Sequence, residues 1–261
     1  MDSEAVLTLM RSVAEAVIRP RFRSLANSQI AEKTPGDYVT VADREAEERL
    51  TEALSAAYPE AAVIGEEAVF ADPSLLDGLA EREHAFVVDP VDGTRNFVQG
   101  NPDYAVMIGE LRLGVTVRAW IWQPEHDVAL VGRRGGGVER NGVPLRPLER
   151  PARPRGVSAP RKFRGLSDPL LAAPIARSWS SCGIDYPNLL AGAADFICFN
   201  PPKPWDHVPG VLFLRELGGV ARTVAGIDYG PAVRDGYLIA AATPAAWQAA
   251  EAVVTAKLAD A

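Results

Sequence analysis

The stretch that decides the fold spans residues 85–97 and reads Ala85-Phe86-Val87-Val88-Asp89-Pro90-Val91-Asp92-Gly93-Thr94-Arg95-Asn96-Phe97. Its first four residues are apolar, which is typical of a strand buried on both faces. Two carboxylates follow, Asp89 and Asp92, and Pro90 between them stiffens the turn. Gly93 allows a ligand to approach the backbone closely, and a helix can begin at Thr94. The stretch therefore predicts a buried strand that delivers two carboxylates to the edge of a sheet.

The end of this stretch also suits an anion. The free N–H groups at the start of a helix bind phosphate readily, so a phosphate group would lie beside the two carboxylates. Carboxylates repel a phosphate unless a cation lies between them, and a site with oxygen ligands alone suits Mg²⁺. The alternative interpretation is an ordinary turn, because Asp, Pro and Gly are the usual turn residues.

Two further carboxylate positions favour a metal site over a turn. Glu66 and Glu67 follow a second predicted strand that ends at Gly65, and Asp206 lies in the first turn of a predicted helix. Each acid alone has an ordinary explanation, as a surface residue or as a favourable charge at a helix N-terminus. We expect His207 to be a packing histidine, and no spacing of Cys and His indicates zinc.

Apolar periodicity predicts the remaining elements. Helices are expected over residues 4–25, 40–58, 206–217 and after Pro244, and strands over 61–64, 85–88, 115–121, 127–131, near Val157 and over 237–241. Thr40 and Asp43 have the spacing of a capping box. Residues 34–37 and 133–137 predict turns, and residues 147–160, rich in proline and arginine, predict a surface crossover between two halves. Strands and helices in both halves imply sheets layered with helices.

Length and composition exclude several classes of protein. A chain of 261 residues is long enough to bury a full core, and 48% hydrophobic and 23% charged residues are ordinary globular values. The net charge of −7 disfavours nucleic-acid and membrane-surface binding. Cys182 and Cys198 form no disulfide framework, which favours two reduced thiols. The first residues do not read as a signal peptide and no apolar run reaches about 18 residues, so we expect a cytoplasmic protein.

Together these motifs resemble the inositol monophosphatase family of Mg²⁺-dependent, lithium-sensitive phosphatases. The resemblance runs along nearly the whole chain, and the three carboxylate motifs in this order and spacing are highly specific. The segments that carry it are Lys33, Asp37 to Asp43, Gly65-Glu66-Glu67, Asp89 to Thr94, Arg140 to Leu145 and Trp205-Asp206.

The resemblance implies a fold and a quaternary state. The expected fold is mixed α/β, a layered α-β-α-β-α sandwich of the inositol monophosphatase and fructose-1,6-bisphosphatase type. Residues 1–148 would form an N-terminal half that carries most metal ligands, and residues 149–261 a C-terminal half that carries Asp206. The site would lie between the halves, and the protein would be a homodimer.

The resemblance also implies residue roles. Two or three Mg²⁺ ions are expected, with Glu66, Asp89 and the Val91 carbonyl at the first. Asp89, Asp92 and Asp206 would hold the second, and Glu66 would help to hold a third through water. Further roles are a phosphate site at Gly93 and Thr94, a Thr94–Asp43 pair that orients and deprotonates the attacking water, and a supplementary positive charge from Lys33 near the mouth.

The substrate side departs from the family pattern. Inositol-specific members carry a glutamate about six residues before the Trp-Asp motif, and this chain has Phe199 there. Asp92, Gly93, Thr94, Gly183, Asp185 and Asp206 are the expected substrate-binding residues. Asp185 is a candidate ligand for a hydroxyl or amine, or alternatively a helix N-cap. The substrate would be a small sugar, cyclitol or related phosphate, with histidinol phosphate and a 3′-phosphonucleotide open.

Two other functions compete with this one. A haloacid-dehalogenase-type phosphatase also places an Asp-rich turn after a strand, but its two Asp are two residues apart, whereas Asp89 and Asp92 are three apart. A trapped phospho-aspartate at Asp89 would favour that class. A non-catalytic RNA- or protein-binding member of the family is the other alternative, and the acidic charge balance argues against it.

Overall fold

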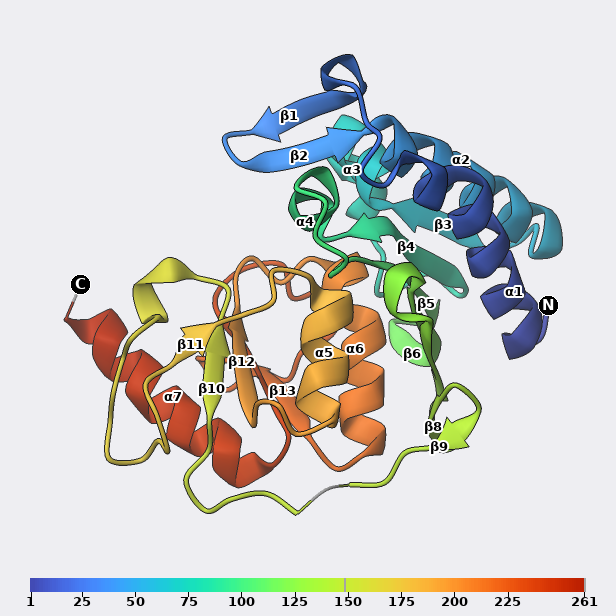
Figure 1. Ribbon diagram of the computed structural model, residues 1–261. Helices are drawn as coiled ribbons and strands as arrows, with labels where there is room; N and C mark the ends of the chain where they lie inside the picture. The colour runs from blue at the N-terminus through green and yellow to red at the C-terminus, as the bar shows by residue number, and fades with distance from the viewer. Residues whose placement is uncertain (148, 261) are drawn as a thin grey trace.

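Helices and two large sheets alternate in layers (Figure 1). The computed structural model describes residues 1–147 and 149–260. The larger sheet has the order β3 (Ala62–Gly65), β4 (Ala85–Asp92), β5 (Ala105–Arg112), β6 (Val115–Gln123), β7 (Val128–Arg133), β8 (Gly137–Arg140) and β9 (Val143–Pro144). The smaller sheet has the order β11 (Ala176–Arg177), β10 (Gly156–Ser158), β12 (Phe196–Phe199), β14 (Leu238–Ala241) and β13 (Val220–Thr223).

The deciding stretch forms β4 near the edge of the larger sheet. All eight of its residues are buried, and the strand continues to Asp92, four residues beyond the predicted end at Val88. It pairs in parallel with β3 and antiparallel with β5, and its register with β5 shifts between Asp89 and Asp92. This irregularity lies at Pro90, which cannot donate a ladder hydrogen bond. Gly93 then has φ +87°, which favours glycine, and α4 (Thr94–Val98) begins.

The two predicted strands over residues 115–121 and 127–131 are confirmed, and they form a hairpin. β6 and β7 pair antiparallel, and the turn around residues 133–137 leads into β8. Asp127 was expected in the second strand, but it has a left-handed φ of 50° and precedes it. β5 was missed because seven of its eight residues are buried, so it shows no alternation of apolar and polar residues.

Two helices cover one face of the larger sheet: α1 (Ser3–Val13) and α2 (Val41–Ala57). The prediction of one helix to residue 25 is wrong. The chain continues through a π-helical turn, Ala14–Ile18, and a 3₁₀ turn that ends at Arg21. Pro20 explains this end, because its ring cannot join a regular α-helical ladder. The predicted capping box is confirmed, since Thr40 N and Oγ1 both contact Asp43 Oδ2, at 2.8 and 2.6 Å.

The C-terminal half supplies the middle and last layers. α5 (Cys182–Leu190) and α6 (Pro204–Glu216) lie between the sheets, and α7 (Pro244–Ala259) covers the outer face of the smaller sheet. The layered α-β-α-β-α fold is therefore confirmed. The prediction that a helix begins at Asp206 is two residues late, because Pro204 occupies the first turn, where its missing N–H has no cost.

The remaining short elements connect these layers. They are α3 (Glu66–Ala71), the hairpin β1 (Ile30–Thr34) and β2 (Asp37–Thr40), and the 3₁₀ turns η3 (Asn27–Gln29), η4 (Pro73–Leu76), η5 (Pro124–His126) and η6 (Arg161–Phe163). A division into halves at residue 148 stays a prediction, and Leu148 itself lies outside the described residues. Side chains of α5 and α6 share one core with the larger sheet, so the two halves are joined by buried apolar contact. Among the described residues, no helix has the length and apolar character that crossing a membrane requires.

Candidate active site

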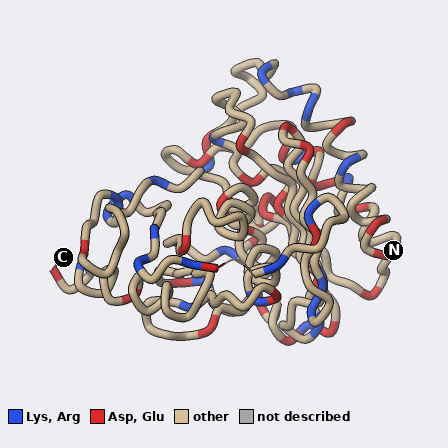
Figure 2. The backbone as a smooth tube through the Cα atoms, turned by 60° about the horizontal axis from the view of Figure 1, so that its bottom comes forward, with Lys and Arg blue, Asp and Glu red and all other residues tan. Residues whose placement is uncertain are grey.

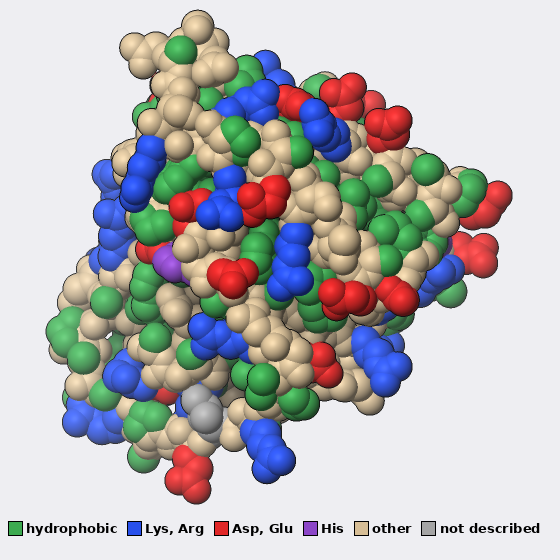
Figure 3. Space-filling view, turned by 45° about the vertical axis from the view of Figure 1, so that its right-hand side comes forward, with side chains coloured by type: hydrophobic (Ala, Val, Ile, Leu, Met, Phe, Trp, Pro, Cys, Tyr) green, Lys and Arg blue, Asp and Glu red, His purple; other side chains and the backbone are tan. Residues whose placement is uncertain are grey.

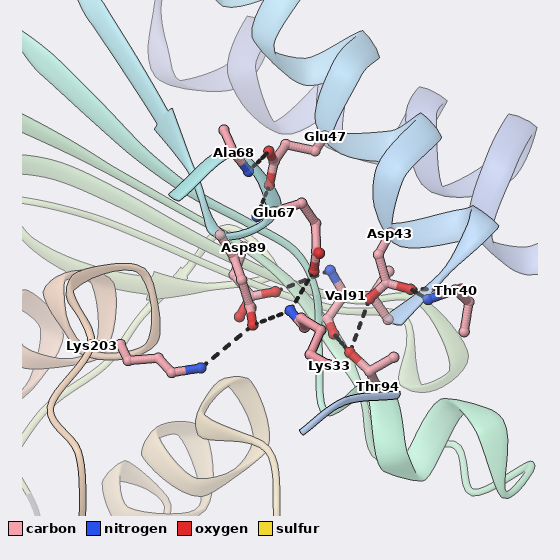
Figure 4. A network of polar contacts seen from close by, with 11 residues as sticks. Lys33, Thr40, Asp43, Glu47, Glu67, Ala68, Asp89, Val91, Thr94 and Lys203 are labelled. Carbon is pink, nitrogen blue, oxygen red and sulfur yellow. Dashed lines mark hydrogen bonds and ion pairs between the residues drawn. The ribbon is translucent and has the colours of Figure 1, made fainter. Parts of the chain in front are cut away.

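Three acids from three elements meet at the junction of the two halves. Glu66 begins α3, Asp89 lies on β4, and Asp206 lies in the first turn of α6. One carboxylate oxygen of each lies within 4.8 Å of the others. Figure 4 shows Asp89 and its surroundings, with Lys203 reaching in from the C-terminal half. The structure thus brings together acids that are 140 residues apart in the sequence, from Glu66 to Asp206.

Asp92 joins the two halves. Its carboxylate accepts hydrogen bonds from the Cys182 N–H at 3.1 Å and the Gly183 N–H at 2.7 Å, and from the Ser181 hydroxyl. All three donors lie at the start of α5, where backbone N–H groups have no partner within the helix. The prediction of Gly183 as a substrate-side residue remains open, and the structure gives it this positioning contact.

Thr94 and Asp43 form the predicted pair. The Thr94 hydroxyl lies 2.9 Å from Asp43 Oδ1 and 3.0 Å from the Val91 carbonyl oxygen, and it can donate its proton to either. Asp43 is fixed from the other side by Thr40 in the capping box, as Figure 4 shows. Burial raises the pKa of Asp43 to about 7 despite the opposing hydrogen bond from Thr40. The pair is thus rigidly placed beside the end of β4.

Two lysines neutralise part of this acidic centre. Lys33 on β1 contacts Glu66 at 2.9 Å and Glu67 at 2.7 Å, and its side chain is only 3% exposed. Lys203 contacts the same Glu66 oxygen at 3.5 Å. Sequence reasoning placed Lys33 near the mouth of the site and overlooked Lys203. The available signal was its position, three residues before Asp206 in a chain with few lysines.

The carboxylates of this centre are buried close together, which disfavours their ionised forms unless a further cation binds. Burial raises the pKa of Asp206 to about 8, and Glu66 and Asp92 add to that rise against the opposing effect of Lys203. Burial and the neighbouring Glu66 raise the pKa of Asp89 well above its ordinary value. Glu66 keeps a lowered pKa, because Lys203 and Lys33 outweigh the effect of its burial.

The donor set fits a hard divalent cation. Glu66, Asp89 and Asp206 offer oxygen atoms only, and such ligands suit Mg²⁺. Asp92 and the Val91 carbonyl, which the resemblance adds as ligands, are also oxygen donors. The raised pKa values of Asp89 and Asp206 also favour a bound cation, because a nearby positive charge would stabilise the ionised forms of these buried acids. The residues could therefore hold Mg²⁺, and the number of ions stays a prediction.

Lys203 is expected to weaken metal binding. An ammonium group close to a dication repels it, although a partly exposed lysine can swing away and relieve most of the repulsion. We expect Lys203→Met to tighten Mg²⁺ binding about tenfold, or about 1.4 kcal/mol. Calorimetric titration without substrate measures this change. Lys257→Met on α7 is the matched control, and unchanged affinity in Lys203→Met would contradict the assignment.

Other predicted residues have different surroundings. The Asp185 carboxylate is 1% exposed and accepts the Trp179 N–H at 2.8 Å, so its role as a substrate ligand has no support in the structure. It is not a helix N-cap either, because Ser181 precedes α5. Phe199 is buried and stacks on Tyr186.

The predicted packing histidine and free thiols are confirmed. His207 is 1% exposed, and its Nδ1 lies 3.1 Å from the Tyr186 hydroxyl. Burial lowers the pKa of His207 to about 3, so the ring is neutral. Cys182 and Cys198 are both free thiols.

Comparisons with known proteins identify the fold and then the family. A solved IMPase of Thermotoga maritima has a TM-score of 0.82 at 21% identity, covering 98% of each chain. The extragenic suppressor protein SuhB of Bartonella henselae has a TM-score of 0.78 at 25% identity, covering 96% of this chain and 97% of that one. The fold is therefore that of the inositol monophosphatases.

Sequence similarity extends this result beyond the fold. Inositol-1-monophosphatase of Rhizobium meliloti is 33% identical over 209 residues, 76% of each chain. Nus factor SuhB of Pseudomonas aeruginosa is 30% identical over 235 residues, 84% of each chain. The profile of the inositol monophosphatase family matches residues 3–259. The chain belongs to the inositol monophosphatase family.

Proposed function

We propose that the protein is a Mg²⁺-dependent phosphomonoesterase that hydrolyses a small phosphate ester by attack of water. The observation that carries the proposal is the oxygen-only cluster of Glu66, Asp89 and Asp206 at the junction of the halves, next to Asp92 and the Thr94–Asp43 pair. Membership of a family whose named relatives include inositol-1-monophosphatases supports it.

Each part of the site has a defined task in this reaction. Bound Mg²⁺ supplies the Lewis acidity that makes water a nucleophile near neutral pH. Thr94 and Asp43 orient the water and hold its proton, since their oxygen atoms already share a hydrogen bond. We assign the phosphate to the Gly93 and Thr94 N–H groups and the Thr94 hydroxyl, as the family resemblance implies. Asp92, fixed by the start of α5, keeps the two halves at the spacing that the reaction needs.

Thr94→Val is expected to lower kcat about 100-fold, because it removes the hydroxyl that touches Asp43 and the Val91 carbonyl. Valine has nearly the same shape as threonine, so the fold should be kept. Initial rates at saturating Mg²⁺ measure the effect. Thr94→Ser restores the hydroxyl and should stay within about tenfold of the wild type. An equal loss of kcat in Thr94→Val and Thr94→Ser would show that the Thr94 hydroxyl has no role in the reaction.

The substrate is tested with a panel of phosphomonoesters. The panel holds inositol 1-phosphate, histidinol phosphate, a nucleoside 3′,5′-bisphosphate and fructose 1,6-bisphosphate, each measured with Mg²⁺ and with a chelator. Because Phe199 lies where inositol-specific members have a glutamate, we expect another ester to have a higher kcat/KM than inositol 1-phosphate. A preference for inositol 1-phosphate would contradict this expectation. Trapping of a phosphorylated Asp89 would favour the haloacid-dehalogenase-type chemistry.

A second candidate function comes from the relatives named Nus factors. Proteins named Nus factor SuhB in Vibrio cholerae and Pseudomonas aeruginosa are each 30% identical to this chain. On the face shown in Figure 3, acidic and basic side chains are interspersed, and the net charge is −7, so we favour the enzyme. A scaffold without catalysis would release no phosphate above background from any ester of the panel.

Three further properties belong to this proposal. We expect a homodimer, inhibition by Li⁺ and a cytoplasmic location, as the family resemblance implies. Light scattering tests the first, and Li⁺ titration of phosphate release tests the second. Labelling of the protein in cells tests the third.

A further inference from the structure

Glu66 is carried by a helix that is too short to hold its own position. α3 has six residues, and its N-cap, Gly65, has no side chain to accept a hydrogen bond from the first turn. The first N–H groups of a helix have no partner within it, and isolated helices of this length do not persist in water. The placement of the Glu66 carboxylate beside that of Asp89 therefore depends on contacts from outside α3.

Glu47 on α2 supplies the missing cap. Its Oε2 accepts the Glu67 N–H at 2.8 Å, and its Oε1 accepts the Ala68 N–H at 2.8 Å, as Figure 4 shows. Glu47 precedes these two residues by 20 and 21 positions, so only the packing of α2 against α3 brings it there. A carboxylate at this end of a helix is also favoured by the helix dipole. One side chain thus satisfies two N–H groups of the first turn.

These two bonds account for the burial of the Glu47 carboxylate. Glu47 is 6% exposed, and across residues 1–147 and 149–260 no basic side chain lies within 4.0 Å of its carboxylate. A buried carboxylate is unfavourable unless hydrogen bonds compensate for the lost water, and the two N–H groups do so here. Figure 2 shows acidic positions (red) along the whole trace, so an acid near the centre is ordinary in this chain. Its burial and its two backbone donors set Glu47 apart.

Gly65 leaves the space that the Glu47 carboxylate occupies. A Cβ atom on Gly65 would lie 2.1 Å from Cδ of Glu47 and 2.4 Å from each of its carboxylate oxygens. The φ of Gly65 is −95°, which any residue can adopt, so the close approach of Glu47 is what requires glycine here. Gly65 pairs with Val88 in the parallel ladder of β3 and β4, so the next residues, Glu66 and Asp89, come close together.

We propose that Glu47 is a positioning residue of the acidic centre. By binding the N–H groups of Glu67 and Ala68, it fixes the first turn of α3 and thereby holds the Glu66 carboxylate beside Asp89. Partners outside the ligand shell that orient metal ligands commonly change metal affinity 10- to 100-fold. The inference rests on the proposed Mg²⁺-dependent function and assigns part of the Mg²⁺ affinity to an acid whose two oxygens are both occupied by backbone N–H groups.

The test is calorimetric titration with Mg²⁺, without substrate, of the wild type, Glu47→Gln and Glu47→Asp. Glutamine keeps the size of the side chain, but its NH₂ group cannot accept a hydrogen bond, so one of the two bonds is lost. Aspartate keeps the charge but is one methylene shorter and cannot reach both N–H groups. We expect Mg²⁺ binding at least about tenfold weaker in both variants. A loss in Glu47→Gln alone would show that only the charge of Glu47 matters, and would overturn the positioning role.

Thr243→Ala is the matched control. The Thr243 hydroxyl caps α7 by accepting the Ala246 N–H at 3.1 Å, so its removal lowers stability through loss of a helix cap far along the chain from α3. The Mg²⁺ affinity of this variant should equal that of the wild type. A loss as large as in Glu47→Gln would show that the Mg²⁺ affinity follows general stability, and would also overturn the positioning role.

Gly65→Ala tests the same contact with every charge retained, and it remains informative if Glu47→Gln does not fold. Its methyl group displaces the Glu47 carboxylate, so Mg²⁺ binding should again weaken at least about tenfold. Because both changes remove one cap, the double variant with Glu47→Gln should bind Mg²⁺ within about twofold of the weaker single variant. Additive losses would show that the two changes act on different contacts, and would overturn the shared cap.

Hydrogen exchange without metal or ester measures the cap directly. Amides of residues 66–71 should exchange at least about tenfold faster in Glu47→Gln than in the wild type, because α3 opens more often without its cap. Unchanged exchange would overturn the cap. Absence of Mg²⁺ binding by the wild type would overturn the proposed function together with this inference. Equal Mg²⁺ binding by the wild type, Glu47→Gln and Gly65→Ala would overturn the inference and leave the phosphatase proposal intact.

Discussion

Replacing Asp89 by asparagine is expected to lower kcat at least ~100-fold at matched, saturating Mg²⁺, the loss that removal of one preorganised electrostatic group causes. Asp89 is 2% exposed, and its carboxylate lies within 4.8 Å of oxygens of Glu66 and Asp206. Asparagine keeps the shape and can still accept the Val91 N–H that now binds Oδ1 at 3.1 Å. The variant should therefore fold normally and lose mainly the negative charge that a cation requires.

The control for this variant is Asp228→Asn, whose carboxylate is exposed and pairs with Arg222. It should keep wild-type kcat, because it lies outside the acidic centre. Thermal unfolding of both variants confirms that they are folded before rates are compared. Near-wild-type turnover in Asp89→Asn would defeat the assignment of Asp89 as a metal ligand. Asp206→Asn should behave as Asp89→Asn does, since it supplies the carboxylate from the opposite half.

Gly183→Ala is expected to lower both stability and activity. A Cβ atom at this position would lie 2.4 Å from Cβ of Ala105 on β5 and 3.2 Å from Oδ2 of Asp92. The start of α5 must then move, and the hydrogen bond from the Gly183 N–H to Asp92 is strained or lost. We expect the free energy of unfolding to fall by about 1–3 kcal/mol, as overpacking does. We expect kcat/KM to fall at least about tenfold, because a displacement near 1 Å misplaces the reacting groups.

A second substitution provides a specific rescue. Ala105→Gly removes the methyl group that the new Cβ would meet, at a cost of about 1 kcal/mol for glycine in a strand. The double variant should therefore be more active than Gly183→Ala, although Ala105→Gly alone should gain nothing. Full activity of Gly183→Ala, or a double variant no better than the single one, would show that Asp92 is not positioned through this contact.

The parts of the acidic centre that could be predicted from the sequence are those in which neighbouring residues form a recognisable pattern. The apolar run 85–88 ends in Asp89 and Asp92, and the capping box identified Thr40 and Asp43 from spacing alone. Such features depend on residues that are close in the chain, so their physical cause is visible in the sequence. The convergence of Asp206 with Glu66 came from the family resemblance, because no local pattern relates residues so far apart.

The features that were missed depend on tertiary structure. Lys203 lies close to Asp206 in the sequence, but only the fold brings its ammonium group to within 3.5 Å of Glu66. The contact of Ser181, Cys182 and Gly183 with Asp92 also requires the two halves to be packed together. β5 was missed because burial on both faces removes the alternation by which a strand is recognised.

The net negative charge of the whole chain does not describe the charge around the acidic centre. The net charge of −7 argues against a polyanion as partner, yet Lys33 and Lys203 both contact Glu66 in the acidic cluster. A small phosphate ester responds to these nearby groups and to bound cations more than to the charge of the whole chain, which salt screens beyond about 10 Å.

The most direct measurement is phosphate release by the wild-type protein as a function of free Mg²⁺, with the best ester of the panel. We expect no release above background in a chelator, a saturable rise with Mg²⁺, and recovery when Mg²⁺ is restored after chelation. We also expect at least ~100-fold slower release by Asp89→Asn at saturation. Release that is independent of Mg²⁺, or absent at every Mg²⁺ concentration with every ester, would show that the protein is not a Mg²⁺-dependent phosphomonoesterase.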